Sequence, residues 1–264
     1  MMRRSLGHIA LALTAAILSA TACSRDPDPG TPAAAAKGEH LLRQMSDTLV
    51  SASRFTFATA ESLEHPDRST GRVLHFTRTV TVRRPDAMFF ELDGSGDTAI
   101  DVSAYYDGTT VSLRNNARGL WAATTVPGTL DAMLDDVARR YSLPVPIADV
   151  IYSLPYEAFV GRDTKGGFVG RETIDGVECA HLAYVDNLVD VQIWIPSSGQ
   201  PLPRRVELVY RQAPGAPKAR IDFTSWNLAP RFADEVFAFR PGAAPQQVAF
   251  EQLVASMLSA EERR

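Results

Sequence analysis

The sequence has few of the residues that usually build catalytic or metal sites. Its 264 residues include five histidines and two cysteines, and the histidines form no HxH or HExxH arrangement. Zinc sites that can be recognised in a sequence depend on such short spacings. The sequence therefore predicts no metal site and no cofactor.

Motifs for nucleophilic catalysis are also missing. There is no G-x-S-x-G elbow and no phosphate-binding P-loop. Cys179 and His181 lie two residues apart on a predicted strand, which places them about 6–7 Å apart along one face, whereas a Cys–His nucleophile pair needs contact. We interpret them as a buried thiol and a hydrogen-bonded histidine, and we expect no enzyme. The alternative, an envelope hydrolase, needs a convergent polar cluster that the sequence does not display.

The charge balance lacks a basic excess. The 27 basic and 31 acidic residues give a net charge of −4. Binding to nucleic acid requires clustered lysine and arginine that neutralise phosphates, and an anionic membrane surface attracts polybasic segments. Neither partner is expected from the charge pattern.

The N-terminus has the features of an export signal. Arg3 and Arg4 precede an uncharged apolar run, Ile9–Ala20, which is shorter than the roughly 20 apolar residues of a membrane-spanning helix. Small residues at Ala20 and Ala22 then satisfy the rule for signal peptidase. We expect residues 1–22 to be a signal peptide.

Cys23 follows the expected cleavage site. The segment before it resembles a bacterial lipobox, although Leu is more usual than Ala three residues before the cysteine. We expect Cys23 to be acylated and Ser24 to favour the outer membrane; simple secretion and an uncleaved anchor are the alternatives. Residues 23–37 contain three prolines and a glycine and are expected to be a flexible tether.

The remaining residues, 38–264, are expected to form one domain. Helical spacing of apolar residues predicts an amphipathic helix over Glu39–Ser53. The period then changes to two, as where Leu74, Phe76 and Val80 alternate with polar residues. This alternation recurs and predicts about ten or eleven antiparallel strands, a mainly β fold with helices (α+β).

Helices are also expected within and after the strands. Thr129 can cap a helix that ends near Tyr141, and a second helix is expected over Ile147–Leu154, with Pro155 as its stop. The tail from Gln246 to Leu258 can form a closing helix. A sheet with one apolar face must close, fold over or be covered, so a partly filled interior and a fully packed core are both compatible with the pattern.

Six short sequence segments in order resemble a known family. The match extends from about Leu41 to Pro241, nearly all of the mature chain. The segments are Arg84-Pro85-Asp86, Tyr106-Asp107-Gly108, Leu143-Pro144 with Ala148-Asp149-Val150, Gly176-Val177 with His181-Leu182-Ala183, Gln192-Ile193-Trp194-Ile195, and Pro201-Leu202-Pro203-Arg204. Together they resemble the predicted periplasmic proteins named domain of unknown function 2092, a family similar to the lipoprotein-localisation factors LolA and LolB and to mycobacterial lipoproteins.

That resemblance implies an unclosed antiparallel β half-barrel, lidded by helices, with an apolar cavity for acyl chains. Strand parity gives the candidate cavity-lining residues Phe76, Met88, Phe90, Val191, Ile193, Leu208 and Phe223. The candidate lid residues are Leu130, Met133, Leu134, Val137, Ile147 and Ile151. Because a shift of one residue inverts the face of a strand, each assignment depends on the predicted register.

Together, these expectations describe a monomeric envelope lipoprotein, anchored in the outer membrane through Cys23. It would bind or carry a lipid, an acyl chain or a lipoprotein. The alternative is a peptide-binding sensor or an assembly or scaffold protein of the same fold, with an envelope protein as its partner. A groove wide enough for a peptide, or an open sheet edge, would favour that alternative.

Overall fold

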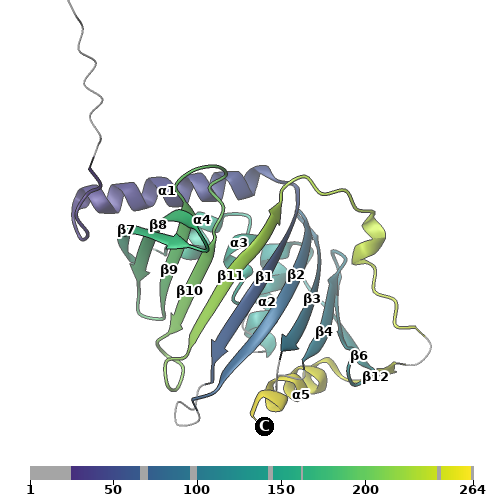
Figure 1. Ribbon diagram of the computed structural model, residues 1–264. Coiled ribbons are helices and arrows are strands. Elements are labelled where there is room, and N and C mark those ends of the chain that lie inside the picture. The colour runs from purple at the N-terminus through teal and green to yellow at the C-terminus, as the bar shows by residue number, and fades with distance from the viewer. Residues whose placement is uncertain are drawn as a thin grey trace, which may run out of the picture.

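The computed structural model describes residues 25–65, 71–95, 100–141, 145–161, 163–242 and 245–262. Twelve strands within these residues form one sheet, in the order β12-β6-β5-β4-β3-β2-β1-β11-β10-β9-β8-β7 (Figure 1). The strands are β1 (Arg54–Glu64), β2 (Val73–Arg83), β3 (Ala87–Ser95), β4 (Asp101–Tyr106), β5 (Thr110–Asn115), β6 (Leu120–Thr125), β7 (Lys165–Ile174), β8 (Val177–Val185), β9 (Val189–Pro196), β10 (Arg205–Tyr210), β11 (Lys218–Asn227) and β12 (Gln246–Gln247).

Alternation of side chains gives the sheet one buried face. In β2, Leu74, Phe76, Val80 and Val82 are buried, and the residues of the opposite parity are exposed or half-buried. Arg78 has the same parity and is also buried, so one charged side chain lies in this apolar row. Successive side chains of a strand point to opposite faces, and the apolar set therefore lies together on the inner side.

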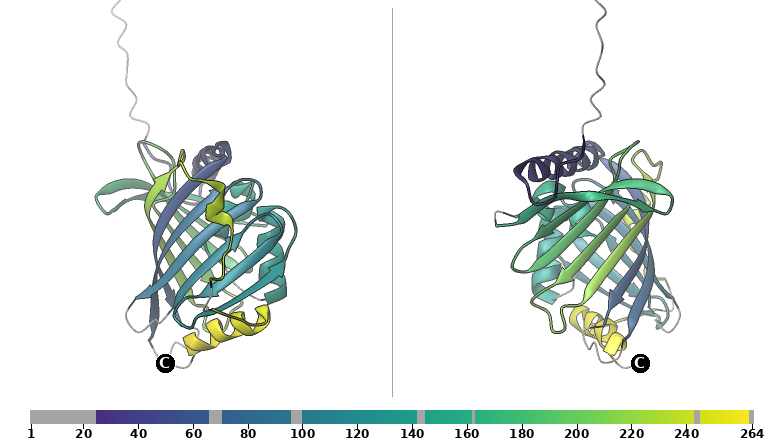
Figure 2. Two further views of the ribbon diagram at one scale, coloured as in Figure 1. Left: turned by 90° about the vertical axis from the view of Figure 1, so that its right-hand side faces the viewer. Right: turned by 60° about the vertical axis from the view of Figure 1, so that its left-hand side comes forward.

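The two halves of the sheet are joined by strands that are far apart in the sequence. β1 pairs with β11, so that Phe57 lies opposite Trp226. Strand pairs along the sheet are antiparallel except for β12, which runs parallel to β6. The end strands β7 and β12 do not pair with each other. The sheet is a curved, unclosed half-barrel (Figure 2), which confirms the expected fold class.

Helices fill the concave side. α2 (Leu130–Tyr141) and the short α3 (Ala148–Ile151) lie inside the curve, and α4 (Pro155–Phe159) follows. The apolar side of α2 and that of α3 are buried in the same core as the inner face of the sheet. This burial is the main source of their stability, because short helices are marginal alone.

The other two α-helices cover opposite ends of the half-barrel (Figure 1). α1 (Pro32–Ser51) crosses one end and contacts β7, whereas α5 (Phe250–Glu262) lies at the other end against β5 and β6. Between β11 and β12, a short 3-10 helix over Asp234–Phe237 lies against β3. Among the described residues, no helix combines the length and apolar character needed to cross a bilayer.

α1 begins at Pro32 rather than at Glu39 as expected. The Thr31 side chain accepts a hydrogen bond from the Ala34 amide, and proline occupies the first turn. Both features are favourable at a helix start. Residues 32–37, which the sequence analysis assigned to the tether, are therefore helical. Cys23 and residues 1–22, the expected signal peptide, lie outside the described residues.

The expected helix over Ile147–Leu154 is shorter than predicted. α3 ends at Ile151, and Pro155 starts α4 instead of stopping a helix. A proline is well placed in the first turn because the missing N–H has no helical acceptor there. The C-terminal tail also differs: Gln246 and Gln247 form β12, and the closing helix starts only at Phe250.

Candidate functional site

A cavity of about 130 Å³ lies on the concave side of the sheet. Its walls come from the end of β1, the start of β2, and from β3, β4, β5 and β11, with the segment before α3 and one residue of α5. Most of its lining is apolar. The apolar residues with the largest side chains are Leu63, Phe76, Phe90, Leu92, Ile100, Val102, Leu113, Ile221 and Met257.

A buried ion pair lies in the wall of this cavity. Arg78 donates from Nε to Glu61 Oε1 at 2.8 Å and from Nη2 to Glu61 Oε2 at 2.9 Å. The two side chains are 8% and 7% exposed. Thr59 donates its hydroxyl proton to Glu61 Oε1 at 2.6 Å. The bidentate geometry and the third hydrogen bond hold both charges in place.

Strand register explains why these residues meet. Thr59 lies directly opposite Arg78 in the β1–β2 ladder, and Glu61 is two residues further on the same face of β1. Burial alone would raise the pKa of Glu61, but the charge of Arg78 and the hydrogen bonds from Arg78 and Thr59 outweigh it and lower the pKa. Glu61 is therefore ionised, and the cavity wall carries a fixed dipole.

The candidate cavity residues divide into two groups. Phe76 and Phe90 line the cavity. The other five are buried on the same apolar core face without lining this cavity: Met88, Val191, Ile193, Leu208 and Phe223. Their role in ligand contact stays a prediction. The sequence analysis missed Glu61 and Arg78, although Arg78 shares the parity of Phe76 and Val80, and a charge in an apolar row was the available signal.

The candidate lid residues are all buried in the core. They are Leu130, Met133, Leu134 and Val137 on α2, and Ile147 and Ile151 before and within α3. From the sheet side, Arg84 Nη1 donates to the Ile151 carbonyl at 2.6 Å. Its Nε and Nη2 are buried without a hydrogen-bond partner among the described residues, and this burial lowers the pKa of the guanidinium.

Asp149 is a second acidic group on the concave side, and its side chain is half-buried. It lies in the first turn of α3, and its side chain keeps part of its surface accessible. Burial raises the pKa of this carboxyl to about 7. Asp149 and Glu61 also help to raise the pKa of the Tyr210 hydroxyl, after the larger effect of burial. The negative charges of Asp149 and Glu61 therefore both act on Tyr210.

Cys179 and His181 lie on the opposite, convex face. His181 stacks on Trp194, with ring centroids 4.3 Å apart, and its two ring nitrogens lie 2.9 Å from Glu172 Oε1 and 2.8 Å from Gln192 Oε1. Cys179 is fully buried, its Sγ contacts the Val177 carbonyl oxygen, and burial raises the pKa of the thiol. The imidazole thus faces an acid and an amide instead of the thiol.

An open β half-barrel with helices in its concavity and a mainly apolar, partly open cavity defines the structural class of this protein. The chain belongs to the family described as predicted periplasmic protein (DUF2092), whose sequence profile matches residues 38–251. This membership confirms the resemblance found in the sequence, and the family description places such proteins in the periplasm.

Solved structures of the same general kind share little sequence with the chain. Lipoprotein LppX from Mycobacterium tuberculosis is 13% identical, with a TM-score of 0.45, 73% of this chain covered and 96% of that one. A LolA superfamily protein from Nitrosomonas europaea is 12% identical, with a TM-score of 0.42 and coverages of 77% and 98%. The Pseudomonas aeruginosa MucA/MucB complex is 14% identical, with a TM-score of 0.41. The match covers 80% of this chain and 63% of that one.

No curated protein matches the sequence. Since each TM-score lies below 0.5, these structures add no argument about function.

Proposed function

We propose that this protein is an envelope lipoprotein that binds or carries an amphiphile, such as a lipid or another acylated molecule, inside the half-barrel. The observation that carries the proposal is the mainly apolar, partly open cavity between the sheet, the segment before α3, and α5. Each buried methylene of an acyl chain would contribute about 0.8 kcal/mol. A ten-carbon segment would thus gain about 8 kcal/mol before the cost of ordering it.

Binding of a whole acyl chain in this cavity would require α2 and α3 to move. Ligand pockets usually measure about 300–1,000 Å³, and a cavity of about 150 Å³ holds one benzene. The 130 Å³ seen here therefore accommodates only part of an acyl chain. Displacement of α2 and α3 from the sheet would extend it into the core that these helices now fill.

Burial of Arg84 opposes the packing of α3 against the sheet. The single side-chain hydrogen bond of Arg84, to α3, leaves two buried guanidinium nitrogens without hydrogen-bond partners among the described residues, although the guanidinium lies 5.3 Å from the centre of the Phe55 ring. An incompletely paired buried charge costs free energy. Opening of α3 would return these nitrogens to water, and this gain offsets part of the loss of apolar contacts.

The Glu61–Arg78 pair indicates that the ligand has a polar end. A hydrocarbon alone gains nothing from a buried ion pair, which is often less stabilising than apolar residues of the same volume. A hydroxyl, ester or headgroup oxygen beside Arg78 would accept a charge-assisted hydrogen bond. The proposed ligand is therefore an amphiphile that places its polar group at this pair and its chain along the apolar wall.

Acylation of Cys23 would anchor this monomer to the periplasmic side of the outer membrane. Attachment through two or more acyl chains is stable, whereas a single chain gives only marginal binding. The proposal is supported by the signal-like N-terminus and by a family description that is periplasmic.

Native mass spectrometry of the mature chain, purified gently from a bacterial envelope, tests the proposal. We expect a lipid mass that added palmitate or lysophosphatidylethanolamine displaces. Leu92→Trp puts bulk into the cavity and should weaken uptake about tenfold or more. Its matched control is Glu91→Trp, at an exposed neighbouring position of β3, which should leave uptake unchanged.

A ligand-free mass and no uptake of either lipid in excess would contradict the proposal. Binding of a polypeptide under the same conditions would then favour the sensor or scaffold alternative. Equal loss of lipid in Leu92→Trp and Glu91→Trp would place the lipid outside the cavity.

A further inference from the structure

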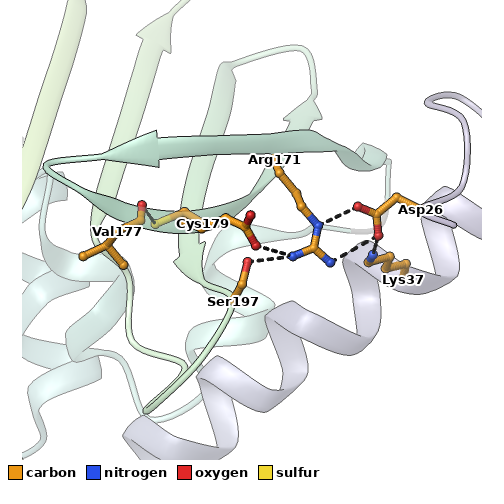
Figure 3. Close-up of polar contacts among 7 residues, drawn as sticks. Asp26, Lys37, Arg171, Val177, Cys179 and Ser197 are labelled. Atoms are coloured by element: carbon orange, nitrogen blue, oxygen red, sulfur yellow. Dashed lines mark hydrogen bonds and ion pairs between the residues drawn. The ribbon is translucent and has the colours of Figure 1, made fainter. Parts of the chain in front are cut away.

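The segment before α1 is attached to the sheet by a network of charges (Figure 3). Asp26 Oδ2 accepts from Arg171 Nε at 2.6 Å, and Asp26 Oδ1 also pairs with Lys37. Arg171 on β7 continues the network through Nη1 to Glu178 Oε1 at 2.7 Å and to Ser197 Oγ at 3.0 Å. Residues from the N-terminal segment, α1, β7, β8 and the turn after β9 are thereby linked.

Packing of α1 supports the same attachment. The Lys37 ammonium lies 4.1 Å from the centre of the Phe168 ring. One turn of α1 touches β7 so closely that a Cβ on Gly38 would lie 2.5 Å from Gly167 Cα. Hydrogen bonds from Arg171 and Lys37 lower the pKa of Asp26 to about 2, so the carboxylate is charged at every physiological pH.

This network shortens the chain that could connect the fold to a membrane anchor. Asp26 follows Cys23 by three residues, which span at most about 11 Å when extended. Without the network, the next held residue is Asp28, whose carbonyl oxygen accepts hydrogen bonds from Thr31, and five residues span up to about 18 Å. The contacts of Asp26 therefore shorten the reach by about 7 Å.

The cavity lies far from this attachment. Four strand spacings separate β11, the cavity-lining strand nearest to the attachment, from β7, which contributes Arg171. At about 4.8 Å for each spacing, the separation along the sheet is about 19 Å. Figure 1 shows α1 at one end of the half-barrel and α5, whose Met257 lines the cavity, at the other.

We infer that Asp26 and Arg171 orient the anchored protein, with the α1 end against the bilayer and the cavity end towards the aqueous compartment. The inference rests on the proposed acylation of Cys23 and adds which end of the anchored protein faces the bilayer. The bilayer contacts the α1 and β7 corner, and an amphiphile exchanges at the distant, α5 end.

Energy transfer from the protein to the bilayer tests this orientation without depending on acylation in the cell. The chain from residue 23, which contains every described residue, is coupled at Cys23 to a maleimide phospholipid in phosphatidylcholine vesicles that carry an acceptor dye on their headgroups. A donor dye is placed through a clickable amino acid at Gln44 on α1 or at Gln252 on α5, both exposed. We expect at least twofold higher transfer from Gln44 than from Gln252.

Asp26→Ala should reduce this difference by half or more, because the longer free segment lets the body rotate. Asp28→Ala is the matched control, since it removes the same charge from an exposed site of the same segment.

Equal transfer from both dyes in the unmodified chain, or higher transfer from Gln252, would overturn the orientation. An unchanged difference in Asp26→Ala would overturn the role of the network. Metabolic labelling of Cys23 with an alkyne palmitate tests acylation separately, so the two failures are distinguishable.

Discussion

At the scale of single residues, the interior of the half-barrel holds charged side chains among its apolar residues. Glu61 and Arg78 neutralise each other in the cavity wall. Asp149 is different, because burial without a compensating charge raises the pKa of its carboxyl to about 7. Its state of protonation therefore changes in the range of pH that the protein meets.

Asp149→Asn should make the protein more stable at pH 8 and leave its stability at pH 4 almost unchanged. The folded pKa is above the ordinary value of 3.8, so the folded chain binds more protons than the unfolded chain between pH 4 and 7. The free energy of unfolding consequently falls as pH rises through this window. Urea unfolding at several pH values measures the effect.

The upper limit of that effect is about 4 kcal/mol, at about 1.4 kcal/mol for each pH unit between the two pKa values. Because the side chain keeps some access to water, we expect about 2 kcal/mol. Asp47→Asn, at an exposed position of α1, is the control and should show little change with pH. An equal gain for Asp149→Asn at pH 4 and pH 8 would contradict the assignment.

Single-residue features could be predicted from the sequence only where they repeat a pattern. Phe76 and Phe90 were identified by strand parity, and both line the cavity. Parity alone could not show that Met88 and Phe223 pack in the filled part of the core. The difference depends on how far the helices extend over the sheet, which is a property of tertiary packing.

At the scale of elements, the contact of α1 with β7 depends on two glycines. A Cβ on Gly38 would meet Gly167 Cα at 2.5 Å and Phe168 N at 2.6 Å, both backbone atoms that cannot move independently. Most strands were predictable because their alternation is local. The early start of α1 and the start of α4 at Pro155 were not predicted, although Thr31 and Pro155 carry the relevant capping signals.

Gly38→Ala separates helix propensity from packing. Propensity alone would stabilise α1 by about 1 kcal/mol, whereas overpacking against β7 typically costs 1–3 kcal/mol. We expect a net loss in the free energy of unfolding. Gln44→Ala on the exposed side of α1 should stay within about 0.5 kcal/mol of the unmodified protein. A gain in stability for Gly38→Ala would show that α1 does not pack tightly on β7.

At the scale of the whole molecule, α5 and the segment before α3 partly cover the cavity on the open sheet. α5 contributes Phe250, Leu253 and Val254 to the core at the cavity end. The outer face is covered by the segment after β11, where Phe239 lies 5.3 Å from Tyr105 and 5.2 Å from Trp121, measured between ring centroids.

Loosening of α5 should open the cavity without unfolding the sheet. In Leu253→Ala/Val254→Ala, we expect increased fluorescence of the apolar dye ANS at pH 7, with the β signal in circular dichroism retained. The midpoint of thermal unfolding should fall, since truncation of a buried Leu costs 2–5 kcal/mol. Gln252→Ala is the control on the exposed side of α5. Unchanged dye binding in the double variant would show that α5 does not close the cavity.

The order of the strands could not be derived from local patterns. Alternation identifies a strand but not its neighbours, and the pairing of β1 with β11 joins residues about 170 positions apart. The family resemblance supplied the half-barrel, and the α5 wall of the cavity appeared only in the structure.

The β1–β11 pairing affects how the chain folds during its synthesis. Phe57 meets Trp226, so β1 keeps an eleven-residue unpaired edge until nearly the whole chain has been made. Such long-range closure is slow, and a long exposed edge invites pairing with other chains. Until β11 is available, this edge of β1 can therefore pair with another chain instead.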